Sequence, residues 1–123
     1  MKSLAEAGYG QVRRQTAEPR QIEYQILTKI ASDLEAAAAQ RDKLFPQLMN
    51  ALQRNTALWT AFATDLMSKD NQCTDEVKAR MIGLAKFSIR HAQAVMAGNG
   101  DVSPLIEVNR TVAAGLRQAA EAA

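Results

Sequence analysis

The clearest hydrophobic pattern along the chain runs from Phe45 to Leu66, a stretch that also holds its only tryptophan. At about 100° per residue, the apolar side chains of this stretch fall on one face. They are Leu48, Ala51, Leu52, Leu58, Trp59, Phe62, Ala63 and Leu66. This pattern predicts a long amphipathic helix whose broad apolar face must be covered by other helices. Trp59 shares that face and is the predicted anchor of the core.

A preceding helix is predicted over residues 19–39 from apolar residues at every fourth position. These residues are Ile22, Ile26, Ile30 and Leu34. Pro19 suits its first turn, where a missing N–H has no consequence, and Glu23 is interpreted as an acid near the helix start, favoured by the helix dipole. Asp42 is a candidate cap for the tryptophan-containing helix, which is expected to reach about residue 68 with Pro46 in its first turn.

Two more helices follow a polar loop. The third is predicted to begin after the cap Thr74 and to end at Gly98-Asn99-Gly100, with a left-handed residue at its terminus. One of its faces carries Val77, Met81, Leu84, Ser88, Ala92 and Val95. Ser103 and Pro104 open the fourth helix, which extends to about residue 120.

Four helices joined by short links predict an all-α fold, a small helical bundle formed as one domain over residues 1–123. Residues 1–16 are weakly helical, and Leu4, Tyr9 and Val12 could lay a short N-terminal segment on the bundle. Composition agrees with this fold class, because much of the 47% hydrophobic share is alanine and aromatic residues are only 5%.

Two asparagines lie among the apolar residues of their helices, Asn55 in the second helix and Asn109 in the fourth. A buried amide must find hydrogen-bond partners or cost about 1–3 kcal/mol. One interpretation is that each amide reaches a helix edge or a backbone carbonyl. The other is a buried polar contact between Asn55 and Asn109 that fixes the register of the two helices.

The third helix is apolar on more than one face. Ile82, Ile89 and Met96 recur at every seventh residue beside its main apolar line. Two interpretations stay open: the helix is central and buried nearly all round, or this second stripe is exposed for a partner. Ile82, Ile89 and Met96 are therefore candidate partner-binding residues.

Catalytic and metal-binding patterns are not found in the sequence. His91 is the only histidine and Cys73 the only cysteine, so neither has a second ligand of its kind for a metal site. No phosphate-binding loop or nucleophile–base pair is visible. We expect no enzyme activity, no metal and no cofactor. A single cysteine cannot form an internal disulfide, so the sequence gives no reason to expect an oxidising compartment.

Net charge and the length of apolar runs restrict the kinds of partner that we expect. The formal net charge of +2 is too small to imply nucleic acid or an acidic membrane by itself. No apolar run approaches the roughly 20 residues needed to span a bilayer, and the N-terminal residues lack the apolar core of a signal peptide. We therefore expect a soluble, cytoplasmic protein that does not bind membranes.

Two groups of basic residues are candidates for an RNA-binding surface. Arg13, Arg14 and Arg20 cluster near the start, and Lys86 and Arg90 lie one turn apart in the third helix. No aromatic residue is interleaved with them as a stacking platform, and acidic residues are scattered between the bases. Solvated helix faces are the preferred interpretation, and direct contact with nucleic acid is not expected.

Three stretches in the right order resemble one family. They read GYGQVRRQTAEPRQIEY at residues 8–24, NALQRNTALWTAFATDL at 50–66 and PLIEVNRTVAAGLR at 104–117. The sequence resembles FlaF, a family of small flagellar biosynthesis regulators of alphaproteobacteria. None of the three stretches is a catalytic fingerprint, so the specificity of the resemblance comes from their agreement in order.

The resemblance implies a protein that binds flagellin as an export chaperone and acts with a second regulator, FlbT. The alternative that it implies is a post-transcriptional regulator that acts with FlbT on flagellin message. A structural adaptor without a flagellar client is a third, weaker possibility. What the residues add is an apolar surface on a small helical bundle, which suits an amphipathic helix of a client.

Overall fold

A computed structural model describes residues 17–122, with side chains placed from residue 21 to 118. Within that range the chain forms four helices and no strand: α2 (Ala17–Ala39), α3 (Phe45–Leu66), α4 (Asp75–Met96) and α5 (Ser103–Ala122). The predicted all-α bundle is confirmed. The proposed N-terminal segment with Leu4, Tyr9 and Val12 lies outside the described residues, as do Arg13 and Arg14.

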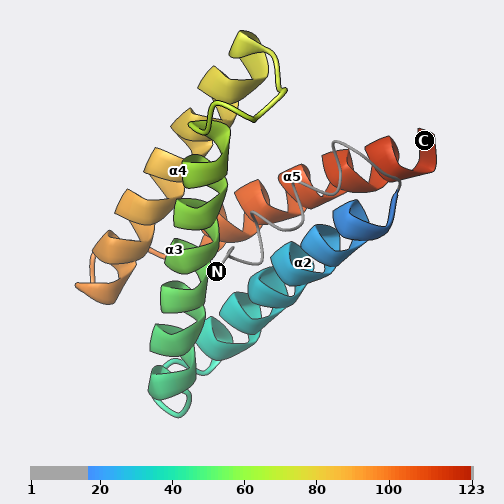
Figure 1. Cartoon of the computed structure of the whole chain (residues 1–123). Coiled ribbons are helices and arrows are strands. Elements are labelled where there is room, and N and C mark those ends of the chain that lie inside the picture. Colours follow the sequence, from blue (N-terminus) through green and yellow to red (C-terminus); the bar gives the residue numbers. More distant parts are fainter. Residues whose placement is uncertain (1–16, 123) are drawn as a thin grey trace.

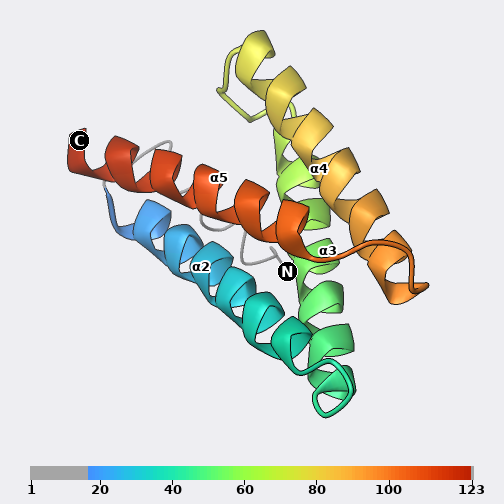
Figure 2. The ribbon, with the colours of Figure 1, turned by 180° about the vertical axis from the view of Figure 1, so that it is seen from behind.

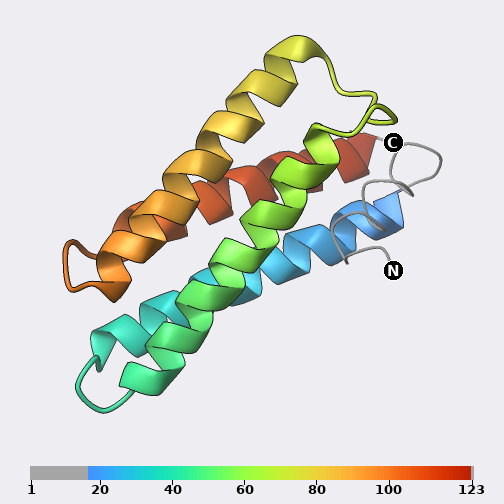
Figure 3. The same cartoon turned by 60° about the vertical axis from the view of Figure 1, so that its left-hand side comes forward.

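The four helices form two antiparallel pairs (Figures 1 and 2). Helix α2 lies along α5, and α3 lies along α4; α2 also packs against α3, while α4 meets α5 over a much shorter stretch. Figure 3 shows the α3–α4 pair in front of the α2–α5 pair. Helices α3 and α5 face each other diagonally, with no Cα atom of one within 8 Å of a Cα atom of the other.

The first two helices begin differently from the prediction. Helix α2 starts at Ala17, so Glu23 lies beyond the first turn, and its side chain is only 1% exposed. Asp42 does not cap α3: the residue before this helix is Leu44, which makes no side-chain cap, and the helix ends at Leu66 rather than residue 68. Pro46 lies in the first turn and has no N–H, so this helix start has one fewer unsatisfied donor for a cap to bind.

Helix α4 has the ends that its sequence predicts. The Oγ1 atom of Thr74 accepts a hydrogen bond from the N–H of Val77 over 3.2 Å. At the other end Gly98 adopts a φ of 87°, which is open to glycine at no steric cost. The N–H of Gly98 donates to the Val95 carbonyl over 3.0 Å and that of Asn99 to Ala94 over 2.8 Å. These two bonds make a Schellman motif, which satisfies the last carbonyls of the helix.

Helix α5 is capped by a residue that the sequence pattern did not single out. The Oδ1 atom of Asp101 accepts a hydrogen bond from the N–H of Ser103 over 2.7 Å. Hydrogen bonds from the side chain and the backbone of Ser103 hold the pKa of Asp101 below its ordinary value. The predicted cap Ser103 is therefore the donor of this contact, and the acidic acceptor comes from the loop before it.

The core lies between the helix pairs. Its largest fully buried apolar side chains are Trp59, Phe62, Leu27, Leu34, Leu48, Leu52, Leu66, Leu105 and Val95. Trp59 is 0% exposed, and its ring meets Phe62 edge to face with centroids 5.3 Å apart. By contrast, α4 buries mainly small residues, namely Ala85, Ser88 and Ala92. Small side chains allow its backbone to approach its neighbours closely.

Candidate functional site

A buried polar chain crosses the bundle between α3 and α5. The indole Nε1 of Trp59 donates to the Oδ1 atom of Asn109 over 2.8 Å. The Nδ2 atom of Asn109 in turn donates to the Oδ1 atom of Asn55 over 2.8 Å. All three side chains are 0% exposed. The structure thus joins the two asparagines that the sequence placed on apolar faces and adds Trp59 to them.

The indole fixes the direction of this chain of hydrogen bonds. A Trp side chain can only donate, so Asn109 must turn its oxygen toward Trp59. Its amide nitrogen then faces Asn55, which must present its own oxygen. Within the described residues the Nδ2 atom of Asn55 has no hydrogen-bond partner. One donor-only group therefore sets the orientation of both amides.

The sequence held a signal for the role of Trp59, because a buried indole N–H generally finds an acceptor. Trp59 and Asn55 are four residues apart on α3, so both can reach one side chain on a facing helix. The sequence could not show that this side chain is Asn109, since that depends on how α5 lies against α3. The three residues anchor the two helix pairs to each other and are not exposed to a partner.

The second apolar stripe of α4 consists of Ile82, Ile89 and Met96, called the α4 stripe below. All three side chains are partly exposed. Ile89 and Met96 also pack against the core, whereas Ile82 is not part of that packing. Helix α4 is therefore not buried nearly all round, because Lys86, Phe87 and several polar neighbours are exposed. Binding of a partner by the α4 stripe stays a prediction.

A groove lies between α4 and α5, and the sequence pattern did not predict it. Its volume is about 270 Å³, and it is lined by Leu84, Phe87, Pro104, Glu107, Val108, Thr111 and Val112. Phe87 is 43% exposed and stacks on His91, with ring centroids 5.5 Å apart. Phe87 belongs to neither of the two apolar faces that the sequence pattern assigns to this helix. That it joins Val108 and Val112 is a consequence of the short contact between α4 and α5.

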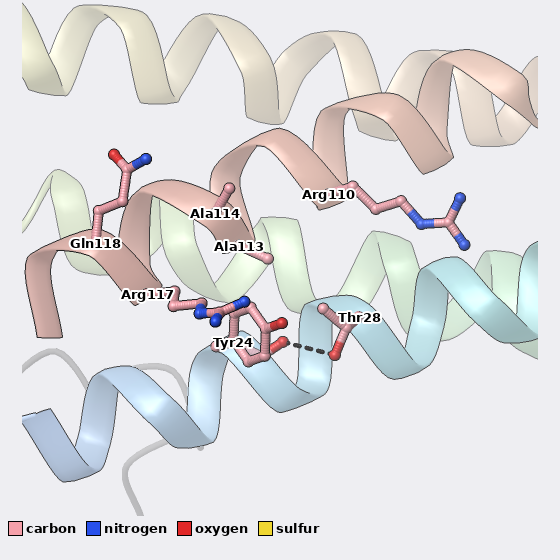
Figure 4. Close-up of a pocket in the computed structure, with 7 residues that line it drawn as sticks. All are labelled: Tyr24, Thr28, Arg110, Ala113, Ala114, Arg117 and Gln118. Carbon is pink, nitrogen blue, oxygen red and sulfur yellow. Dashed lines mark hydrogen bonds between the residues drawn. The ribbon is translucent and has the colours of Figure 1, made fainter. Parts of the chain in front are cut away.

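A second groove lies between α2 and α5 and has a polar lining (Figure 4). It is about 460 Å³ in volume and is lined by Tyr24, Thr28, Arg110, Ala113, Ala114, Arg117 and Gln118. The Thr28 hydroxyl donates back to the Tyr24 carbonyl over 3.0 Å. Arg110 is paired with Glu35 across the two helices at 3.2 Å. The charge of Arg110 is thus used within the bundle.

Ion pairs also tie α2 to α3, beside a third groove of about 480 Å³. Asp33 accepts from Lys29 and from Arg54, each over 2.9 Å. The hydrogen bond from Lys29 and then that from Arg54 hold the pKa of Asp33 below its ordinary value, although partial burial opposes them. Because Arg54 belongs to α3, the Asp33 carboxylate links α2 to α3. Its contact with Lys29 also links two successive turns of α2.

The described part of the chain, residues 17–122, carries neither a candidate metal site nor a membrane-spanning helix. Residues 17–122 contain no group of three or more His, Cys, Asp or Glu side chains placed to hold a metal ion. No helix there is both long and apolar enough to cross a bilayer. Cys73 is a free, partly exposed thiol, and the Nε2 atom of His91 is hydrogen-bonded to the Asp101 carbonyl at 2.7 Å. His91 thus has a structural contact at the α4–α5 turn.

These features define a small all-α bundle with a buried hydrogen-bond network of Trp59, Asn109 and Asn55 in its core and partly exposed apolar side chains along α4. Residues 5–116 match the family described as "Flagellar protein FlaF". The chain belongs to the FlaF family and is a flagellar protein. No curated protein and no solved structure matches it.

Proposed function

We propose that this FlaF-family protein binds flagellin subunits in the cytoplasm before export, and that it supports their synthesis and secretion together with an FlbT-type regulator. Membership of a flagellar family supports the pathway. The observation that carries the binding role is that the α4 stripe, an apolar row along one helix, is partly exposed. An amphipathic helix of a client can lay its apolar face on such a stripe.

The α4 stripe has the geometry that helix recognition needs. Residues Ile82, Ile89 and Met96 are two turns apart in succession, so they form one row about 20 Å long. Methionine suits a binding surface because its side chain is flexible and polarisable. The terminal regions of flagellin, which we take as amphipathic helices before polymerisation, are the proposed occupants.

The binding test uses one charged substitution on the stripe. Ile82→Asp should abolish capture of monomeric flagellin and leave the helical circular dichroism unchanged, since Ile82 is partly exposed and not packed on the core. Ala57→Asp, an exposed alanine on α3, is the matched control and should bind as the wild type does. Ile89→Asp is less informative because it should also destabilise the fold. A folded Ile82→Asp variant that still binds flagellin would place the binding surface elsewhere.

In cells, loss of the protein should reduce motility and extracellular flagellin while basal bodies still assemble. Co-purification of the protein with flagellin from a secretion-blocked strain gives the direct check. The alternative function, regulation of flagellin message with FlbT, predicts different results in these binding experiments. Under that alternative, flagellin synthesis changes, the purified protein does not bind flagellin, and any message binding survives physiological salt.

A further inference from the structure

We infer that the α4 stripe binds an amphipathic helix whose polar flanks are acidic, and that Lys78 and Lys86 are the residues that select it. The identity of the client rests on the proposed function, but the chemistry of the bound helix does not.

The first observation is the position of the two lysines relative to the stripe. Lys78 lies one turn before Ile82 and Lys86 one turn after it, so helical periodicity places one lysine on each side of the apolar row. Lys78 is partly buried and Lys86 is exposed. Lysine can lay its methylene stem along apolar surface and keep its ammonium group in water. We call this pair the basic rim.

The second observation is that neither lysine of the basic rim is ion-paired within the described residues, although Asp75 and Glu76 precede Lys78 in the first turn of α4. In the sequence, no Asp or Glu occurs between Phe45 and Thr64, or between Val77 and Met96. Helices α3 and α4, which lie side by side (Figure 3), therefore present apolar, neutral and basic groups over most of their length.

The three grooves described above differ from this surface in charge. Glu107 lines the apolar groove between α4 and α5. In the groove between α2 and α5, Arg110 is already paired with Glu35. In the groove between α2 and α3, Asp33 is held by Lys29 and Arg54. The α4 stripe combines apolar contact with basic charge that has no ion-pair partner among residues 21–118, which is complementary to an apolar face with acidic flanks.

Spacing specifies the occupant further. Lys78 and Lys86 are eight residues apart, which corresponds to about 12 Å along the helix axis. A helix lying along α4 would match both ammonium groups with acidic residues eight positions apart, one at each edge of its apolar face. A helix with basic residues at those positions would place like charges together, which opposes binding.

The test uses two synthetic helical peptides with the same leucine face, one with glutamate and one with lysine at the flanking positions. The wild-type protein should bind the glutamate peptide at least about tenfold more tightly than the lysine peptide, with an affinity that falls as salt is raised. Lys86→Glu should remove that preference. Arg80→Glu is the matched control, because Arg80 is exposed on the opposite side of α4 and the change in net charge is the same. Equal affinity for both peptides, or equal effects of the two variants, would overturn the inference.

Flagellin and lipid vesicles complete the design. If the wild type prefers the glutamate peptide but does not bind flagellin, the proposed function fails and this inference stands. If flagellin binds Lys86→Glu and Arg80→Glu equally well, the inference fails and the proposed function stands. Anionic phosphatidylglycerol vesicles test a membrane as the occupant of the same surface. Lys86-dependent binding to the vesicles without a preference between the peptides would also overturn the inference.

Discussion

Trp59 and Asn109 are joined by a buried hydrogen bond of 2.8 Å, although α3 and α5 have no pair of Cα atoms within 8 Å. The long indole of Trp59 spans the space between two helices that face each other diagonally. Asn109 then passes the contact on to Asn55, back on α3. One side chain of α5 is thus held at two points by α3, which fixes the position of one helix pair against the other.

Because Asn109 bonds two partners, we expect Asn109→Leu to be more destabilising than Asn55→Leu. The first substitution strands the Trp59 N–H and the Asn55 amide, whereas the second strands only the Asn109 nitrogen. Each stranded group costs about 1–3 kcal/mol. The double substitution should lose less stability than the sum of the two single ones. Urea unfolding of the four proteins measures this coupling energy, and a value within error of zero would contradict a shared network.

Trp59 makes two kinds of contact, and two substitutions separate them. Trp59→Ala should cost roughly 3–5 kcal/mol, as other buried large-to-small changes do, which would leave a domain of this size marginal. Trp59→Phe keeps an aromatic ring beside Phe62 but leaves the Asn109 oxygen without its donor. Its stability should fall between those of the wild type and the alanine variant. An unchanged melting temperature for Trp59→Ala would be incompatible with its place in the core.

Replacing a glycine with alanine should stabilise the protein at two positions and destabilise it at a third. Gly83 and Gly115 lie inside helices, and an added Cβ would meet no heavy atom within 4 Å apart from the adjacent residues and the backbone of its own helix. Alanine at either position should stabilise the protein by about 0.5–1 kcal/mol, because alanine loses less conformational freedom in a helix. At Gly98 the same change should destabilise by about 1–2 kcal/mol, because its φ is positive. Thermal unfolding of the three variants decides this, and stabilisation by Gly98→Ala would contradict the Schellman motif.

The Asp33 ion pairs should give a stability difference that depends on pH. Hydrogen bonds from Lys29 and Arg54 lower the pKa of Asp33 in the folded state, so its charged form stabilises the fold above the unfolded pKa. That contribution is lost as the pH falls through the folded-state pKa of Asp33, which lies below its ordinary value of 3.8. Partly exposed pairs of this kind are worth about 0.2–1 kcal/mol. Asp33→Asn should therefore be less stable than the wild type at pH 7, and the gap should be smaller at pH 3, which lies below the ordinary pKa of 3.8.

Asp42→Asn serves as the control for that experiment, because Asp42 is exposed in the turn before α3 and does not cap the helix. Its stability difference from the wild type should stay small at both pH values. A gap for Asp33→Asn that persists unchanged at low pH would show that the lost contact is not electrostatic.

The sequence by itself determined the helices and several of their ends. The spacing of apolar residues is a local property of each segment, so it could be read without the fold. Thr74 and Gly98 mark the two ends of α4 for the same reason, since a cap acts on the turn next to it. The presence of Asn55 and Asn109 on apolar faces also followed from periodicity alone.

Only the tertiary structure decided which side chains meet. Trp59 could have found any acceptor, and its bond to Asn109 depends on the diagonal placement of α3 and α5. Likewise, Phe87 lines a groove because α4 and α5 share only a short contact. The burial of Glu23 was also beyond the sequence pattern. Periodicity assigns a residue to a face of its own helix, but what covers that face is set by packing between segments far apart in the chain.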